Sequence, residues 1–211
     1  MARQTKVPMP TLERLATYLR HLNEMEAAGA ETISSAEMEE ATGIHAAQFR
    51  KDLSYFGEFG RPGIGYNVYD LQKRIAKILK VEKEQPVILV GAGNLGSALV
   101  GYQGLRHHNF HIVAVFDNNY NKIGRQLWDL EILDVNRLRE VNEEMQAEIA
   151  ILTVPAPAAQ SVTDQLVKAG TKVILNFAPT VIRVPENVVV RNVCFIQELA
   201  VLSYHLSGER T

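Results

Sequence analysis

Three glycines in the segment VGAGNLG, namely Gly91, Gly93 and Gly96, have the spacing of a turn that binds a pyrophosphate. The apolar run PVILVG precedes them and a helical pattern follows, so the turn joins a strand to a helix. There the first glycine permits the tight turn, the second lets the backbone approach the phosphates, and the third lets helix and strand pack closely. We therefore expect a bound dinucleotide rather than a purely structural turn. The same expected site includes Ala92, Asn94 and Leu95.

An acidic residue, Asp117, ends the next apolar run, FHIVAVFD, about 20 residues after the turn. An acid at that place accepts hydrogen bonds from the hydroxyls of an adenosine ribose, and its charge repels a 2′-phosphate. The sequence therefore predicts NAD(H) rather than NADP(H). The neighbouring Asn118, Asn119 and Lys122 do not change that expectation.

Two short segments, small and mostly apolar, follow later apolar runs. Because ligands of open α/β sheets bind beyond the carboxyl ends of the strands, both segments are expected to line the same pocket. No carboxylate is evident there to offset the desolvation of a positive ring, so the pocket favours the reduced, neutral dihydronicotinamide. The residues are Thr153, Val154, Pro155, Asn176, Phe177, Ala178 and Pro179.

Residues with acid–base or metal chemistry do not form a catalytic pattern. The pair Tyr69 and Lys73 precedes the nucleotide-binding region. His107, His108 and His111 have no carboxylate close in sequence, which predicts a surface loop and not a metal site. No enzyme is predicted. An NAD-dependent oxidoreductase with a helical appendage is the alternative.

A second group of functional residues lies in a helix predicted from about His45 to Phe56. Ser34 and Glu37 form a capping box for the preceding helix, and Gly43 ends it, so only a short turn separates the two helices. This is helix–turn–helix spacing. The outward face and its flanks suit a DNA major groove, although a solvated amphipathic helix is the alternative. The expected DNA-binding residues are Ala47, Gln48, Arg50, Lys51, Ser54 and Tyr55.

The segment GEFGRPGIGYNV follows this helix and predicts a short hairpin, because proline and glycine at its centre favour a type II turn. Arg61 would lie at the hairpin's tip and could enter a minor groove. A helix–turn–helix followed by such a hairpin is a winged helix. The first 80 residues contain eleven basic and ten acidic residues, so the positive charge must be concentrated on one face.

The remaining composition is that of a globular protein. The 211 residues have a net charge of −2 and no apolar run long enough to span a bilayer. The single cysteine, Cys194, excludes an internal disulfide framework and is expected to be a small packed residue. A reducing cytoplasm is the expected location.

Strands alternate with helices in the second half, which predicts an α/β fold with a parallel, doubly wound sheet of the Rossmann type. We expect a winged-helix DNA-binding domain over residues 1–80 and a charged linker over 81–86. The nucleotide-binding domain is expected over 87–194, followed by an amphipathic helix and tail over 195–211.

These motifs together resemble the Rex family of redox-sensing transcriptional repressors over nearly the whole chain. The resemblance depends on SSAEMEEATGIHAAQFRKDLSYFGEFGRPGIGY, VGAGNLGSAL, TVP and NFAP, in the family's order. It implies a homodimer that binds a palindromic operator on double-stranded DNA, free or with NAD⁺, and releases it on binding NADH. It also implies a C-terminal helix exchanged between subunits.

By position, the resemblance implies that Arg50 and Lys51 are the basic pair of the recognition helix and that Tyr102 lies near the nicotinamide. Cys194 stands where the family usually has aspartate, an acid that takes part in its redox-dependent contacts, and Glu198 is a candidate substitute. Two other functions stay open: the oxidoreductase, and a nucleotide-binding regulator that answers another ligand such as a CoA derivative.

Overall fold

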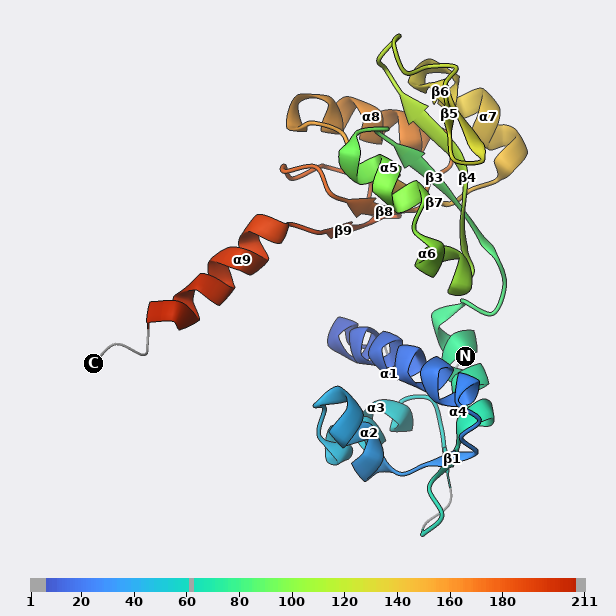
Figure 1. The fold of residues 1–211 in the computed structure, drawn as a ribbon, viewed down its shortest axis with the longest axis vertical. Coiled ribbons are helices and arrows are strands. Elements are labelled where there is room, and N and C mark those ends of the chain that lie inside the picture. Colours follow the sequence, from blue (N-terminus) through green and yellow to red (C-terminus); the bar gives the residue numbers. More distant parts are fainter. Residues whose placement is uncertain (1–6, 61–62, 208–211) are drawn as a thin grey trace. The chain divides into compact units, whose positions relative to one another are not determined.

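The computed structural model describes residues 7–60 and 63–207. The chain forms two compact units, Met1–Lys83 and Glu84–Thr211 (Figure 1). Each unit buries apolar side chains of its own. β3 begins at Gln85, inside the segment predicted as a linker.

The N-terminal unit is built from four helices and one short antiparallel strand pair among its described residues. Its core is lined by side chains such as Leu15, Phe49 and Ile75, all fully buried. A capping box at Ser34 and Glu37 begins the second helix, and Gly43 ends it with φ +69°, as the sequence predicted. The elements are α1 (Met9–Ala27), β1 (Thr32–Ile33), α2 (Ser35–Thr42), α3 (Ala46–Ser54), β2 (Tyr66–Asn67) and α4 (Val68–Leu79).

The hairpin expected after α3 has a different strand pairing. β2 pairs with β1, which precedes the helix–turn–helix, and residues 57–60 form no strand. Arg61, the predicted tip, lies outside the described residues.

The C-terminal unit contains one seven-stranded sheet within its described residues, in the order β5-β6-β4-β3-β7-β8-β9. All neighbours are parallel except β5 and β6, so the predicted parallel sheet is confirmed with an antiparallel edge strand added. The strands are β3 (Gln85–Val90), β4 (Phe110–Asp117), β5 (Gln126–Leu127), β6 (Leu130–Asp134), β7 (Ile149–Leu152), β8 (Val173–Asn176) and β9 (Val189–Asn192).

Helices pack on both faces of this sheet. Side chains of α7 and α8 join one apolar core, and those of α5 and α6 pack against the other. The helices are α5 (Asn94–Val100), α6 (Gln103–His107), α7 (Leu138–Met145), α8 (Ala156–Lys168) and α9 (Phe195–Tyr204), with 3₁₀ turns Val135–Arg137 and His205–Ser207. Within the described ranges, no helix is long and apolar enough to cross a membrane.

The single helix predicted after the glycine-rich turn is two helices, α5 and α6, broken at Gly101 and Tyr102. A Cβ at Gly101 would lie 2.4 Å from the ring of Trp128, which is at the turn between β5 and β6. The close approach of that indole requires glycine, and the helix ends there.

Candidate nucleotide-binding and DNA-binding sites

The glycine-rich turn runs from the end of β3 into α5, and its three glycines have different environments. Gly91 has φ +111°, and a Cβ there would lie 2.7 Å from the carbonyl oxygen of Thr153. A Cβ at Gly96 would lie 2.0 Å from the carbonyl oxygen of Gly91, so α5 packs directly on the turn. A Cβ at Gly93 would meet nothing within 4 Å. Packing therefore requires glycine at positions 91 and 96. At position 93 the fold has room for a side chain, and glycine leaves that space open.

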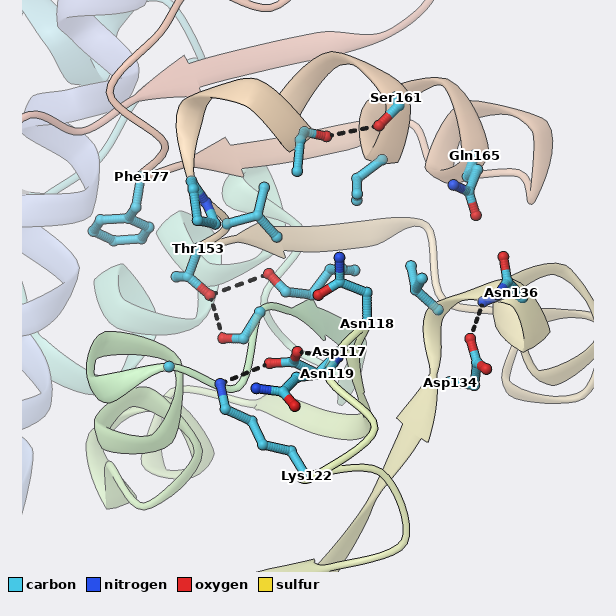
Figure 2. A pocket seen from close by; sticks show the side chains of 18 of the residues that line it. Asp117, Asn118, Asn119, Lys122, Asp134, Asn136, Thr153, Ser161, Gln165 and Phe177 are labelled. Atoms are coloured by element: carbon cyan, nitrogen blue, oxygen red, sulfur yellow. Dashed lines mark hydrogen bonds and ion pairs between the residues drawn. The ribbon is translucent and has the colours of Figure 1, made fainter.

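That space belongs to a cavity of about 810 Å³ at the carboxyl ends of the parallel strands (Figure 2). The volume lies within the range of small-molecule and cofactor sites. Polar side chains of the β4 and β6 ends lie on one side and the first turns of α8 on another. The open backbone at Gly93 and this volume fit a dinucleotide.

Asp117 ends β4 at the cavity and is held in one orientation by three donors. Its Oδ2 accepts hydrogen bonds from the Ala92 amide at 2.9 Å and from Lys122 Nζ at 3.1 Å. Its Oδ1 accepts the Asn119 amide at 2.8 Å. Since a carboxylate has about four acceptor sites, one remains for a ribose hydroxyl.

The predicted cofactor residues divide between the cavity wall and its support. Those that line the cavity are Gly91, Gly93, Asp117, Thr153, Val154, Pro155, Phe177 and Pro179. Asn176 is fully buried, and its amide donates to Thr180 and Asn192 and accepts from the Ala178 amide, so it shapes the loop after β8. The others outside the lining are Ala92, Asn94, Leu95, Gly96, Tyr102 and Ala178.

Several cavity residues were not singled out by sequence reasoning. All but one come from the end of β6 with the 3₁₀ turn after it and from α8, which have no recognised motif. The only signal was that Asp134 follows an apolar run in LEILD, a strand that the sequence analysis did not identify. The missed residues are Asp134, Val135, Asn136, Ala158, Ser161, Val162 and Gln165, together with Tyr120.

α3 exposes the face predicted to meet DNA. Ala47, Arg50, Lys51, Ser54 and Tyr55 are all exposed, whereas Phe49 and Leu53 are buried in the core. Arg50 donates to the Ser35 hydroxyl at 2.7 Å, which links it to the start of α2. Gln48 is half-buried and donates to Asp52 at 2.9 Å.

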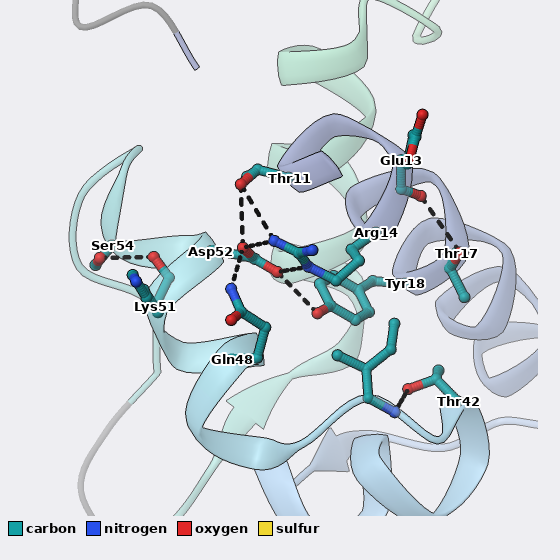
Figure 3. A network of polar contacts seen from close by, with 11 residues as sticks. Thr11, Glu13, Arg14, Thr17, Tyr18, Thr42, Gln48, Lys51, Asp52 and Ser54 are labelled. Atoms are coloured by element: carbon teal, nitrogen blue, oxygen red, sulfur yellow. Dashed lines mark hydrogen bonds and ion pairs between the residues drawn. The ribbon is translucent and has the colours of Figure 1, made fainter. Parts of the chain in front are cut away.

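Asp52 is a buried carboxylate that sequence reasoning did not consider (Figure 3). Arg14 on α1 donates to both of its oxygens, at 2.6 and 2.7 Å. The hydroxyls of Tyr18 and Thr11, also on α1, donate at 3.0 and 3.2 Å. Burial alone would raise the pKa of Asp52, but hydrogen bonds from Arg14, Gln48 and Tyr18 outweigh it and hold that pKa below its usual value.

This network ties the recognition helix to α1 through a charge that no solvent reaches. The signal in the sequence was an aspartate at a position of α3 that helical spacing turns toward the core, next to Leu53. A buried carboxylate needs a cationic partner.

Comparison with known proteins identifies the family of the chain. A family model described as "CoA binding domain" matches residues 82–180, and one described as "Putative DNA-binding protein N-terminus" matches residues 6–54. The "Redox-sensing transcriptional repressor Rex" of Carboxydothermus hydrogenoformans is 48% identical over 95% of this chain and 97% of that protein. That of Pelotomaculum thermopropionicum is 49% identical over 95% and 94%. The chain belongs to the Rex family.

Solved structures of Rex-family proteins have the same fold. A crystal structure of RSP in complex with β-NAD⁺ and operator DNA matches with a TM-score of 0.91 and 38% identity, over 97% of this chain and 94% of that one. A structure of RSP in complex with β-NADH matches with a TM-score of 0.87 and 36% identity, over 97% and 96%. The predicted fold class, with an N-terminal DNA-binding domain before the Rossmann-type sheet, is confirmed.

The Rex-family relatives are named as transcriptional repressors, a role without catalysis. The enzyme alternative is therefore not favoured. Three further residues were singled out by resemblance to the Rex family. Tyr102 is the N-cap of α6 and 61% exposed, and Cys194 is the half-buried N-cap of α9. Glu198 is exposed in the first turn of α9.

Proposed function

We propose that this chain is a redox-sensing repressor that binds operator DNA through its N-terminal unit and NAD(H) through its C-terminal unit. It binds the operator when free or with NAD⁺ and leaves it when NADH is bound. The observation that carries this proposal is one chain with both an exposed recognition helix and a cavity at a glycine-rich turn. The family relatives and the RSP complexes with β-NAD⁺, β-NADH and operator DNA support it.

On the DNA side, the exposed face of α3 enters the major groove. Ala47 and Ser54 allow close approach, and Arg50 and Lys51 bind phosphates or base edges. Gln48 and Tyr55 lie at the edges of this face. The minor-groove role of Arg61 stays a prediction from the sequence.

On the cofactor side, Asp117 holds the adenosine ribose and the turn from Gly91 to Gly96 holds the pyrophosphate. When bound, the nicotinamide supplies a ring that is positive when oxidised and neutral when reduced. Val154, Pro155 and Phe177 give the end of the cavity an apolar wall. Such a wall disfavours an unpaired positive charge, so the reduced cofactor binds more tightly.

Release of DNA follows from this difference in affinity, because a ligand shifts an equilibrium only by its differential affinity for two states. The protein acts in the cytoplasm as a homodimer whose two recognition helices span the half-sites of a palindrome. NADH favours a dimer in which the helices no longer match that spacing. The exposed apolar helix α9 supports the dimer.

Fluorescence anisotropy of the labelled operator of RSP, titrated with the full chain, tests the proposal. Saturating NADH is expected to lower operator affinity at least about tenfold relative to saturating NAD⁺. Equal operator affinity with the two cofactors would contradict it.

Lys51→Ala tests the recognition helix in the same assay. The exposed lysine is expected to contact a phosphate, so the variant should bind operator more weakly and with a salt dependence smaller by about one unit of slope. Its NADH affinity should not change. Lys77→Ala on α4 removes the same charge from another exposed helix position and is the matched control. Equal effects of the two variants would contradict the assignment.

A further inference from the structure

Lys122 connects two parts of the nucleotide site, the glycine-rich turn and the end of β4. Its Nζ donates to Asp117 Oδ2 at 3.1 Å (Figure 2). It also donates to the carbonyl oxygen of Ala92 at 3.0 Å. The Ala92 amide donates to the same carboxylate oxygen. Lysine, aspartate and the backbone of the glycine-rich turn therefore form a closed triangle.

The surroundings of this lysine differ from those of an ordinary surface ion pair. The Asp117 side chain is 8% exposed and that of Lys122 is 35% exposed, so both are partly withdrawn from water. Both residues line the cavity. The charge of the ammonium group therefore acts on whatever binds beside Asp117, with less screening than at an open surface.

Asp117 and Lys122 have opposite effects on a phosphate attached to the adenosine 2′-oxygen. The carboxylate repels it, and the ammonium group attracts it and also neutralises part of the carboxylate's charge. The two ribose hydroxyls of NAD(H) are neutral, so they hydrogen-bond to Asp117 but are affected only weakly by the charge of Lys122. The sum of these two charges therefore changes the affinity for a 2′-phosphate much more than it changes the affinity for NAD(H).

We propose that Lys122 sets how strongly this site discriminates between NAD(H) and NADP(H), by offsetting the repulsion that Asp117 exerts on a 2′-phosphate. The inference rests on the proposed binding of NAD(H). Wild-type protein thus binds NADPH more weakly than NADH but measurably, and loss of the lysine charge widens the gap.

Isothermal titration of the full chain with NADH and with NADPH measures this discrimination as a ratio of dissociation constants. Lys122→Met is expected to raise the NADPH/NADH ratio about tenfold, because an uncompensated carboxylate then faces the phosphate. Lys122→Arg keeps the charge and should keep the ratio within about twofold of wild type. Asp117→Asn should lower the ratio.

The NADPH/NADH ratio distinguishes a role of Lys122 in discrimination from a role in supporting the glycine-rich turn alone. If Lys122 only braced Ala92, then Lys122→Met would weaken both dinucleotides equally and the ratio would not move, which would overturn the inference. NADPH binding too weak to detect in wild-type protein would also overturn it. Lys172→Met removes a lysine that pairs with Glu148 outside the cavity, and should leave both constants unchanged. Failure of wild-type protein to bind NADH would contradict the proposed function itself.

Discussion

At the scale of single residues, two glycines of the same turn differ in whether the fold has room for a side chain. A Cβ at Gly96 would overlap the carbonyl oxygen of Gly91, whereas a Cβ at Gly93 would project into open space within the cavity wall. Gly93 has φ −81°, a conformation that alanine adopts without strain. The close packing of α5 on the turn explains why residue 96 is glycine. The second glycine, Gly93, is explained by the proposed dinucleotide, whose pyrophosphate would approach the backbone closely.

Alanine substitutions separate these two roles. Gly93→Ala is expected to leave the melting temperature unchanged and to weaken NADH binding at least tenfold, about 1.4 kcal/mol. Gly96→Ala should destabilise the C-terminal unit by about 2 kcal/mol or more, because backbone must move to admit the methyl group. Calorimetric melting and NADH titration of both variants provide the measurement. Full NADH affinity in Gly93→Ala would exclude pyrophosphate binding at this turn.

At the scale of elements, α1 and α3 meet at a buried charge. Asp52→Asn keeps the shape but removes the charged acceptor of Arg14 and Tyr18 on α1. Loss of one partner from a fully buried ion pair costs about 3–5 kcal/mol, but the Arg14 side chain is 26% exposed and keeps contact with water. Asp52→Asn is therefore expected to lower the free energy of unfolding of the N-terminal unit by about 2 kcal/mol at pH 7.

The effect of Asp52→Asn should depend on pH in a known direction. Because the pKa of Asp52 is lowered in the folded protein, its stabilisation is fully present above the ordinary carboxyl pKa of about 3.9 and is lost as pH falls through the folded value. The difference between wild type and Asp52→Asn should shrink below pH 4. Urea unfolding followed by helical circular dichroism measures it. Glu140→Gln, which breaks an exposed pair with Arg137, is the control and should have little effect.

Helices and strands with strong local signals were predictable, and those set by distant contacts were not. Apolar runs identified β3, β4, β7 and β8, and caps identified α2. The break between α5 and α6 depends on Trp128, whose ring approaches Gly101. Trp128 lies in a turn and has φ +57°, which is unusual for a residue other than glycine. No local sequence pattern predicts that turn.

The same distinction holds for the candidate sites. Gly91, Gly93 and Asp117 belong to a motif whose spacing reflects the ligand, so the sequence predicted their place at the cavity. Gln165 on α8 reaches the same cavity only because of how the helix packs on the sheet. The partner of Asp52 is a residue 38 positions away, and the sequence contains no spacing rule for that pair.

At the scale of the whole molecule, α9 leaves a large apolar surface without cover. Phe195, Ile196, Leu199, Val201 and Leu202 are each more than half exposed, and α9 has no buried residue. Phe195 contacts the sheet domain, with its ring centroid 6.1 Å from that of Phe177. Apolar surface of this kind is typical of protein–protein interfaces.

We expect the full chain to be a dimer in light-scattering measurements, and the double substitution Leu199→Asp and Leu202→Asp to make it a monomer. Two charges cannot be buried in an apolar interface without a large desolvation cost. The variant should keep its circular dichroism spectrum, because neither residue is buried within the chain. Ile64→Asp places a charge at an equally exposed apolar position in the N-terminal unit and should leave the dimer intact. A double variant that stays dimeric would remove α9 from the interface, and with it the proposed link between cofactor binding and the spacing of the recognition helices.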